Sequence, residues 1–168
     1  PQRTLDFTDL CHSCGGCALV CPSDAIREEP LAIGVLRSGT SGAIRFVDGV
    51  LNVGQAMSTP AIRAVKTAAP DAELTILDAP PGTSCPVVET VRDCDLVVLV
   101  TAPTPFGLHD LALAVKMVRA VRRPLAVVLN RAGLGGADGS GECARHGAPL
   151  LAEIPDDRAV AEAYSRGE

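Results

Sequence analysis

After residue 58 the hydrophobic positions fall into short continuous runs that alternate with amphipathic stretches. Near-continuous runs of Val and Leu predict parallel strands that are covered on both faces. Helices are expected between these runs, so the pattern predicts an α/β fold with βαβ crossovers and a mostly parallel sheet. The expected strands are 74–77, 96–101, 125–129 and 150–154, and the expected helices are 58–69, 87–92, 107–122, 139–146 and 157–165.

The chain before residue 58 has a different texture. Short extended runs stand at 33–36, 44–47 and 50–53, and Asp48-Gly49 separates the last two. Because this dipeptide favours two-residue hairpin loops, we expect a hairpin turn at Asp48-Gly49. The expected organisation is a cysteine-rich module at 1–29, a connecting extended segment at 30–57 and the α/β part at 58–168.

Composition narrows the class of protein. The 168 residues fit one domain or one domain with a small appendage. Hydrophobic residues make up 47% of the chain and aromatic residues only 2%, so an aliphatic core is expected. The net charge of −5 and the presence of only two lysines argue against a nucleic-acid surface. No apolar run is long enough to span a membrane and no signal-like N-terminus is visible, so we expect a cytoplasmic protein without stable membrane insertion.

A cysteine-rich run near the N-terminus carries the clearest chemistry. Its spacing, C-x2-C-x2-C-x3-C-P, is that of bacterial ferredoxins. Gly15 and Gly16 within it let the backbone turn tightly and direct N–H groups toward cluster sulfurs. Seven cysteines in an intracellular chain also favour metal ligands or free thiols over disulfides. We interpret four thiols as ligands of a 4Fe–4S cluster, namely those of Cys11, Cys14, Cys17 and Cys21.

The sequence leaves open which metal the cysteine run binds and how many clusters it holds. In two-cluster ferredoxins the fourth cysteine ligates the other cluster, but this chain has no second run of the same spacing. Zinc is the alternative metal, although zinc sites usually use two separated ligand pairs. We therefore expect the run to bind one cluster at most. The other cysteines, which are far apart in the sequence, are Cys85, Cys94 and Cys143.

Polar residues and prolines follow the expected strands, where parallel α/β sheets bind their ligands. Asp78 is followed by the turn residues 79–83, Ala-Pro-Pro-Gly-Thr. A strand-end carboxylate before such a turn suits a magnesium–phosphate site, and a helix cap with a stiff turn explains it equally well. The glycine-rich stretch 133–139 is better explained as a surface loop than as a dinucleotide site.

The strand ends resemble those of one family in order and spacing. Residues 99–104, 127–131 and 154–157 are similar to the strand ends of the MinD/Mrp branch of P-loop ATPases. Together with the cysteine run, the whole chain resembles MinD-superfamily ATPases that carry an inserted ferredoxin domain. The resemblance implies a MinD-like P-loop NTPase sheet and a partial ferredoxin-like module. It also implies ATP and magnesium in a full-length parent, pairing of subunits, and a redox or cluster-acceptor protein as a possible partner.

The resemblance also implies roles for single residues. Asp78 would be the Walker B carboxylate and the catalytic residue. Cys85 directly follows the switch II segment that comes after Asp78, and it is a candidate redox or ligand thiol. The alternative interpretation of Cys85 is a small buried residue. The nucleotide-binding residues implied are Pro80 and Gly82 in switch II, Asn130 at the adenine edge, and Pro155 and Asp156 in the base pocket.

The chain departs from this family because it has no Gly-Lys pair and hence no recognisable phosphate loop. The family's first ferredoxin run is missing as well. Both absences predict a C-terminal part of a longer protein, which would be inactive as an ATPase alone. Without the phosphate-loop strand, we expect the open sheet to be closed by pairing 74–77 with 96–101 or by a second copy.

Three functions follow from these observations. The leading hypothesis is a part of an ATP-dependent iron–sulfur protein that couples nucleotide state to electron transfer or cluster delivery. The alternative is an iron–sulfur electron-carrier module without ATPase activity, which the missing Gly-Lys pair favours for the chain as given. A weaker alternative is an ATP-dependent ligase of the cobyrinate diamide synthase type, but no glutaminase-like domain is visible.

Overall fold

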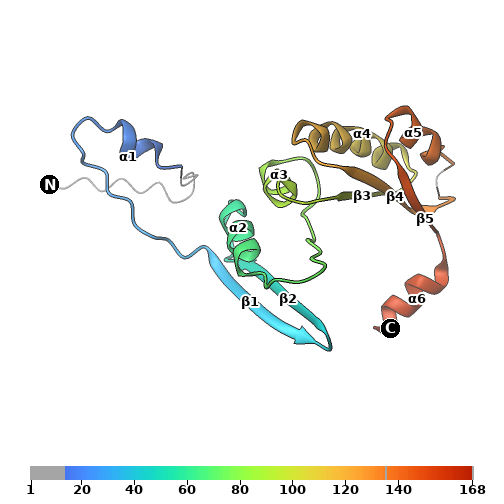
Figure 1. The fold of residues 1–168 in the computed structure, drawn as a ribbon, viewed down its shortest axis with the longest axis horizontal. Helices are drawn as coiled ribbons and strands as arrows, with labels where there is room; N and C mark the ends of the chain where they lie inside the picture. The colour runs from blue at the N-terminus through green and yellow to red at the C-terminus, as the bar shows by residue number, and fades with distance from the viewer. Residues whose placement is uncertain (1–13, 135, 168) are drawn as a thin grey trace. The chain divides into compact units, whose positions relative to one another are not determined.

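The computed structural model of the chain describes residues 14–134 and 136–167. Packing divides the chain into two units, one up to Thr75 and one from Ile76 (Figure 1). Within the described ranges, none of the helices combines the length and the apolar character that a membrane span needs. The segment boundaries predicted after residues 29 and 57 stay predictions.

The first unit contains a hairpin with a helix packed against it (Figure 1). Strands β1 (Gly34–Ser41) and β2 (Ile44–Leu51) pair antiparallel, and helix α2 (Thr59–Ala68) packs on them. A two-stranded hairpin is marginal by itself in water, so α2 supplies the apolar partner for one of its faces. The short helix α1 (Gly16–Val20) lies in the cysteine run and has no buried residue.

The hairpin turn lies at Gly42-Ala43, so the turn predicted at Asp48-Gly49 is wrong. Ser41 pairs with Ile44, which leaves a two-residue loop between the strands. Gly42 has a φ of 58°, a positive value of the kind that tight two-residue hairpin loops require.

Asp48 and Gly49 instead lie within β2, each for a packing reason. Asp48 forms an ion pair with Arg37, the residue opposite it on β1. Gly49 faces α2, and a Cβ atom at this position would lie 3.1 Å from Cγ2 of Val65. The absence of a side chain at Gly49 therefore allows α2 to approach the hairpin closely.

The second unit confirms the predicted α/β fold. Its parallel sheet has the order β3-β4-β5, and the four helices alternate with the strands along the chain (Figure 1). The strands and helices predicted from residue 85 onward are all present, with ends shifted by up to three residues. The bounds are α3 Cys85–Val91, β3 Val97–Thr101, α4 Pro105–Ala120, β4 Leu125–Ala132, α5 Gly139–Arg145, β5 Leu150–Pro155 and α6 Arg158–Arg166.

Aliphatic side chains fill the core between the sheet and helices α3, α4 and α5. Helix α4 places Leu111, Val115 and Val118 on one face by their i, i+4 and i+7 spacing. Val118 and Val127, the latter on β4, are both 0% exposed. The core consists mainly of Val, Leu and Ala side chains, as predicted from the low aromatic content of the sequence.

The opposite face of this sheet is uncovered among the described residues. On β3, Val97 is 8% exposed, whereas its neighbours Val98 and Val100 are 43% and 64% exposed. Ile154 on β5 is 44% exposed, and α6 has no buried residue. Parallel sheets are usually covered on both faces, so coverage on one side departs from the expectation for these Val/Leu runs.

The strand predicted at 74–77 does not form, and its expected pairing with 96–101 is absent from the described sheets. Residues 74–80 are irregular, and Leu74 and Ile76 are 77% and 83% exposed. An apolar run becomes a strand only where a neighbouring strand offers hydrogen-bonding partners, because strand preference depends on context. The order β3-β4-β5 leaves β3 at an edge.

Val127→Ala is expected to destabilise the second unit by about 2–3 kcal/mol, because truncation of a fully buried side chain leaves a cavity. Val100→Ala is the matched control on the exposed face, with an expected change within about 0.5 kcal/mol. Urea denaturation followed by circular dichroism measures both values. Equal losses from the two variants would contradict a core on one side of the sheet.

Candidate functional site

The described cysteines of the N-terminal run are Cys14, Cys17 and Cys21, and Cys11 lies outside the described residues. Cys14 and Cys17 are exposed, and Cys21 is half-buried at the C-terminal end of α1. Thiols at the surface of a glycine-containing loop are accessible to an incoming metal.

The two glycines of the run have distinct geometric roles. Gly15 is the N-cap residue directly before α1 and has a φ of 72°, a left-handed conformation that glycine adopts readily. A Cβ atom at Gly16 would lie 3.4 Å from the sulfur of Cys14, so the missing side chain leaves room around that thiol. The prediction that Gly15 permits a tight turn is confirmed.

Among the described thiols of the run, Cys21 is the one whose sulfur has hydrogen-bond contacts with neighbouring residues. Its sulfur accepts a hydrogen bond from the backbone N–H of Ala25 at 3.3 Å and lies 3.7 Å from the hydroxyl oxygen of Ser23. The hydrogen bonds from the Ala25 backbone and then from Ser23 lower the pKa of the Cys21 thiol. A thiolate is the form that ligates metals, so this turn favours the state of Cys21 that a cluster requires.

The donor chemistry of the run fits an iron–sulfur cluster, since it consists of thiols and the Cys21 sulfur accepts a hydrogen bond from a backbone N–H. Across residues 14–134 and 136–167, no group of three or more His, Cys, Asp or Glu side chains is arranged to hold a metal ion. Cys14, Cys17 and Cys21 lie within those ranges and are not brought together as a metal site, and Cys11 lies outside them. The ligand set therefore rests on spacing and on the chemistry at Cys21.

The cysteines outside the run differ in accessibility. Cys85 is exposed at the first residue of α3, which does not fit the small buried residue considered from the sequence. Cys94 is half-buried and donates to the carbonyl of Thr90 at 3.5 Å. Cys143 is buried in the core, and burial raises the pKa of its thiol. Of these three, Cys85 is the thiol that solvent and ligands can reach.

The carboxyl ends of β4 and β5 bring together residues that are far apart in sequence. Asn130 pairs with Ile154, and Ala132 pairs with Pro155. The backbone N–H of Asp156 donates to the carbonyl of Ala132 at 3.1 Å. Three of the residues predicted to bind nucleotide, Asn130, Pro155 and Asp156, therefore lie at adjacent strand ends, and all three are exposed.

Arg131 is a residue of this edge that sequence reasoning missed. Its Nε lies 3.0 Å from Oδ1 of Asp156, and its backbone N–H donates to Oδ1 of Asn130 at 3.0 Å. Its φ is 58°, and the β4–β5 register shifts between Asn130 and Ala132. Bulges of this kind redirect side chains at the rims of sheets. The only sequence signal was an arginine directly after the strand-end asparagine.

At the end of β3, the threonines serve the local backbone. The Thr101 hydroxyl donates to the carbonyl of Gly107 at 2.8 Å, and Thr104 caps α4 by accepting from the N–H of Gly107 at 3.1 Å. A Cβ atom at Gly107 would lie 2.4 Å from the carbonyl oxygen of Ala102. These contacts fix the start of α4 next to the strand end.

The predicted catalytic and switch residues lie in an exposed irregular stretch. Asp78, Pro80 and Gly82 are all exposed, and Gly82 has a φ of 93°. Because 74–77 does not join the sheet, Asp78 is not held at a strand end. The roles of these three residues stay predictions.

The glycine-rich stretch 133–139 leads into the cap of α5. Asp138 accepts from the N–H of Gly141 at 2.8 Å, and this hydrogen bond, followed by that of Ser140, lowers the pKa of the Asp138 carboxyl. A capping role for Asp138 supports the interpretation of this stretch as a loop before a helix.

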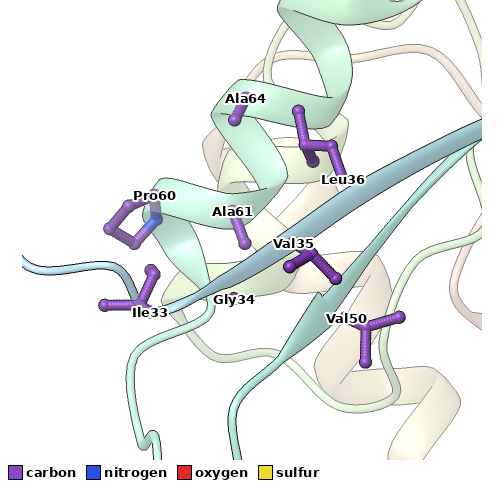
Figure 2. Close-up of a pocket in the computed structure, with 8 residues that line it drawn as sticks. All are labelled: Ile33, Gly34, Val35, Leu36, Val50, Pro60, Ala61 and Ala64. Carbon is purple, nitrogen blue, oxygen red and sulfur yellow. The ribbon is translucent and has the colours of Figure 1, made fainter.

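A small pocket lies in the first unit, between the hairpin and α2 (Figure 2). Its volume is about 150 Å³, and its walls are almost entirely hydrocarbon. Figure 2 shows Pro60, Ala61 and Ala64 of α2 on one side and Val35 and Val50 of the hairpin on the other. Since ligand sites combine apolar walls with a few polar groups, this pocket offers nothing to orient a polar substrate.

Comparison with known proteins bears first on the cysteine run. Residues 6–27 match the family described as "4Fe-4S binding domain". The run is therefore assigned to an iron–sulfur domain. This agrees with the ferredoxin-like spacing of the run, and the match covers the N-terminal part of the chain only.

Two curated relatives come from Methanocaldococcus jannaschii. "Uncharacterized protein MJ0579" is 28% identical over 99% of this chain and 58% of its own length. "Uncharacterized protein MJ0578" is 33% identical over 79% of this chain and 58% of its own length. The chain thus spans a little over half the length of the curated relatives it matches.

Two solved structures are similar to part of this chain. The cell division ATPase MinD of Pyrococcus furiosus is 26% identical, with a TM-score of 0.47, over 54% of this chain and 39% of its own. A ParA family ATPase from Chlorobium tepidum TLS is 20% identical, with a TM-score of 0.41, over 48% of this chain and 35% of its own.

Arg131→Gly is expected to leave the free energy of unfolding within about 0.5 kcal/mol of the parent value or to raise it. Glycine relieves about 1 kcal/mol of strain at positive φ, which offsets the loss of an exposed ion pair. Arg131→Ala loses the ion pair and keeps the strain, so it should be less stable than the glycine variant by about 1 kcal/mol. Urea denaturation measures the difference. An alanine variant as stable as the glycine variant would contradict strain at this bulge.

Proposed function

We propose that this chain is part of an ATP-dependent iron–sulfur protein that couples nucleotide state to electron transfer or cluster delivery. The single observation that carries the iron–sulfur half is the Cys21 sulfur held by the Ala25 N–H within the matched domain. The nucleotide half is supported by the order of the strand-end motifs and by the parallel sheet that presents them.

The cysteine run would hold the cluster, which supplies one-electron transfer chemistry when bound. The cysteines of this chain provide the thiolate ligands, and a hydrogen bond to sulfur stabilises the negative charge on a thiolate. The Ala25 N–H holds the Cys21 sulfur from one side. Three ligands, Cys11, Cys14 and Cys17, suit one cluster, and Cys21 either completes it or serves a second centre.

The exposed edge of the sheet would hold the nucleotide in the complete protein. In this proposal Asn130 reads the base edge through its amide, and Pro155 packs beside the base. Asp156 is engaged by Arg131, so its contribution is to position the ends of β4 and β5 relative to each other. Asp78 would hold a magnesium-bound water, with Pro80 and Gly82 in the segment that senses the γ-phosphate.

A second function, an iron–sulfur electron carrier without ATPase activity in this chain, is favoured by one observation. The sequence has no Gly-Lys pair, so it lacks the lysine and the glycine-rich backbone that supply most phosphate contacts. The two proposals share the cluster and differ in whether the sheet edge binds nucleotide.

Anaerobic reconstitution with iron and sulfide is expected to load at most one cluster, with about four irons per chain. Cys14→Ser should lower the iron content strongly because it removes a ligand. Cys85→Ser is the matched control, since Cys85 is also exposed but lies outside the run. Iron and sulfide analysis with zinc analysis measures the outcome. Stoichiometric zinc without iron uptake would refute the iron–sulfur assignment.

Mg-ATP is expected to bind this chain weakly, because Asn130 and Pro155 alone offer few contacts to a nucleotide. Isothermal calorimetry on the reconstituted chain measures the affinity, with Asp78→Ala as the comparison. Low-micromolar binding that disappears in Asp78→Ala would show that the chain assembles a phosphate site without a glycine-rich loop.

A further inference from the structure

The turn after the cysteine run places a backbone N–H donor and a hydroxyl group beside one sulfur. The N–H of Asp24 donates to the carbonyl of Cys21 at 3.3 Å, and Asp24 has a φ of 48°. This tight turn brings the N–H of Ala25 to 3.3 Å from the Cys21 sulfur. The hydroxyl oxygen of Ser23 lies 3.7 Å from the same sulfur.

The two groups differ in how a substitution can change them. The Ala25 donor is a backbone N–H, which almost any residue at position 25 would supply. The Ser23 group is a side-chain hydroxyl, so it depends on which amino acid stands at position 23. Pro22 fixes the backbone φ between the cysteine and the serine, which limits the positions that the hydroxyl can take.

Hydrogen bonds to a cluster ligand act on the charge of the cluster. One-electron reduction adds one negative charge, part of which lies on the sulfurs, and no covalent bond forms or breaks. Donors directed at sulfur stabilise the added charge and therefore raise the reduction potential. Loss of a donor should make the centre harder to reduce.

We propose that the Ser23 hydroxyl donates a hydrogen bond to the Cys21 sulfur and raises the reduction potential of the iron–sulfur centre that Cys21 ligates. The inference rests on the proposed iron–sulfur function. It makes Ser23 a positioning residue that acts through Cys21 and has no contact of its own with the irons.

The test uses the full chain, reconstituted anaerobically, with dithionite as the electron donor. The midpoint potential is measured by redox titration, with electron paramagnetic resonance of the reduced cluster as the signal. Ser23→Thr keeps the hydroxyl. Ser23→Val has the shape of the threonine side chain but lacks the hydroxyl. Ser58→Ala is the outside control, because the Ser58 side chain makes no cap hydrogen bond.

The proposal expects a more negative midpoint for Ser23→Val and for Ser23→Ala than for the parent chain. The parent, Ser23→Thr and Ser58→Ala should agree with one another. Equal midpoints for the threonine and valine variants, each with full cluster content, would overturn the role of Ser23 and leave the proposed function intact. A parent chain that takes up no cluster would overturn both.

A second readout separates a hydrogen bond from a packing effect. Electron–nuclear double resonance in deuterated water detects exchangeable protons close to the reduced cluster. The parent and Ser23→Thr should show one more exchangeable coupling than Ser23→Val. An unchanged set of couplings in Ser23→Val, with any shift in midpoint, would assign that shift to packing and overturn the proposal.

Discussion

Burial of aliphatic side chains against one face of the β3-β4-β5 sheet is the interaction on which the second unit depends. Helix α4 supplies Leu111, Val115 and Val118, and β4 supplies Val127 at the centre of the sheet. Because the strands are parallel, this packing also places their carboxyl ends at one edge. The meeting of Asn130 and Asp156 at that edge is therefore a consequence of the core.

The cysteine run follows a different physical logic. Helix α1 has no buried residue, and Leu19 and Val20 within it are 87% and 76% exposed. With so little apolar burial, the geometry of the thiols depends on turns, namely the positive φ of Gly15 and of Asp24. Small segments of this kind gain their stability from a bound metal, because the binding free energy becomes folding free energy. The iron–sulfur assignment and the sparse packing of this segment thus support each other.

Much of the fold could be predicted because its signals are local. The Val/Leu runs of β3, β4 and β5, and the amphipathic stretches between them, determine element type without knowledge of contacts. The predictions were wrong where contacts with residues distant in the sequence determine the local structure. Asp48-Gly49 reads as a turn, but Arg37 and Val65 hold it within a strand. The run 74–77 reads as a strand, but the described sheets give it no neighbour. The Arg131–Asp156 pair joins residues 25 positions apart, so no local pattern could indicate it.

The central claim is that the run from Cys11 to Cys21 ligates an iron–sulfur cluster, and Mössbauer spectroscopy of isotopically enriched iron tests it most directly. The account predicts that the anaerobically reconstituted chain shows delocalised mixed-valence iron, as in a 4Fe–4S cluster, with no mononuclear component that accounts for most of the iron. A spectrum dominated by a single iron in a tetrathiolate site, or a chain that holds zinc and takes up no iron, would contradict the account.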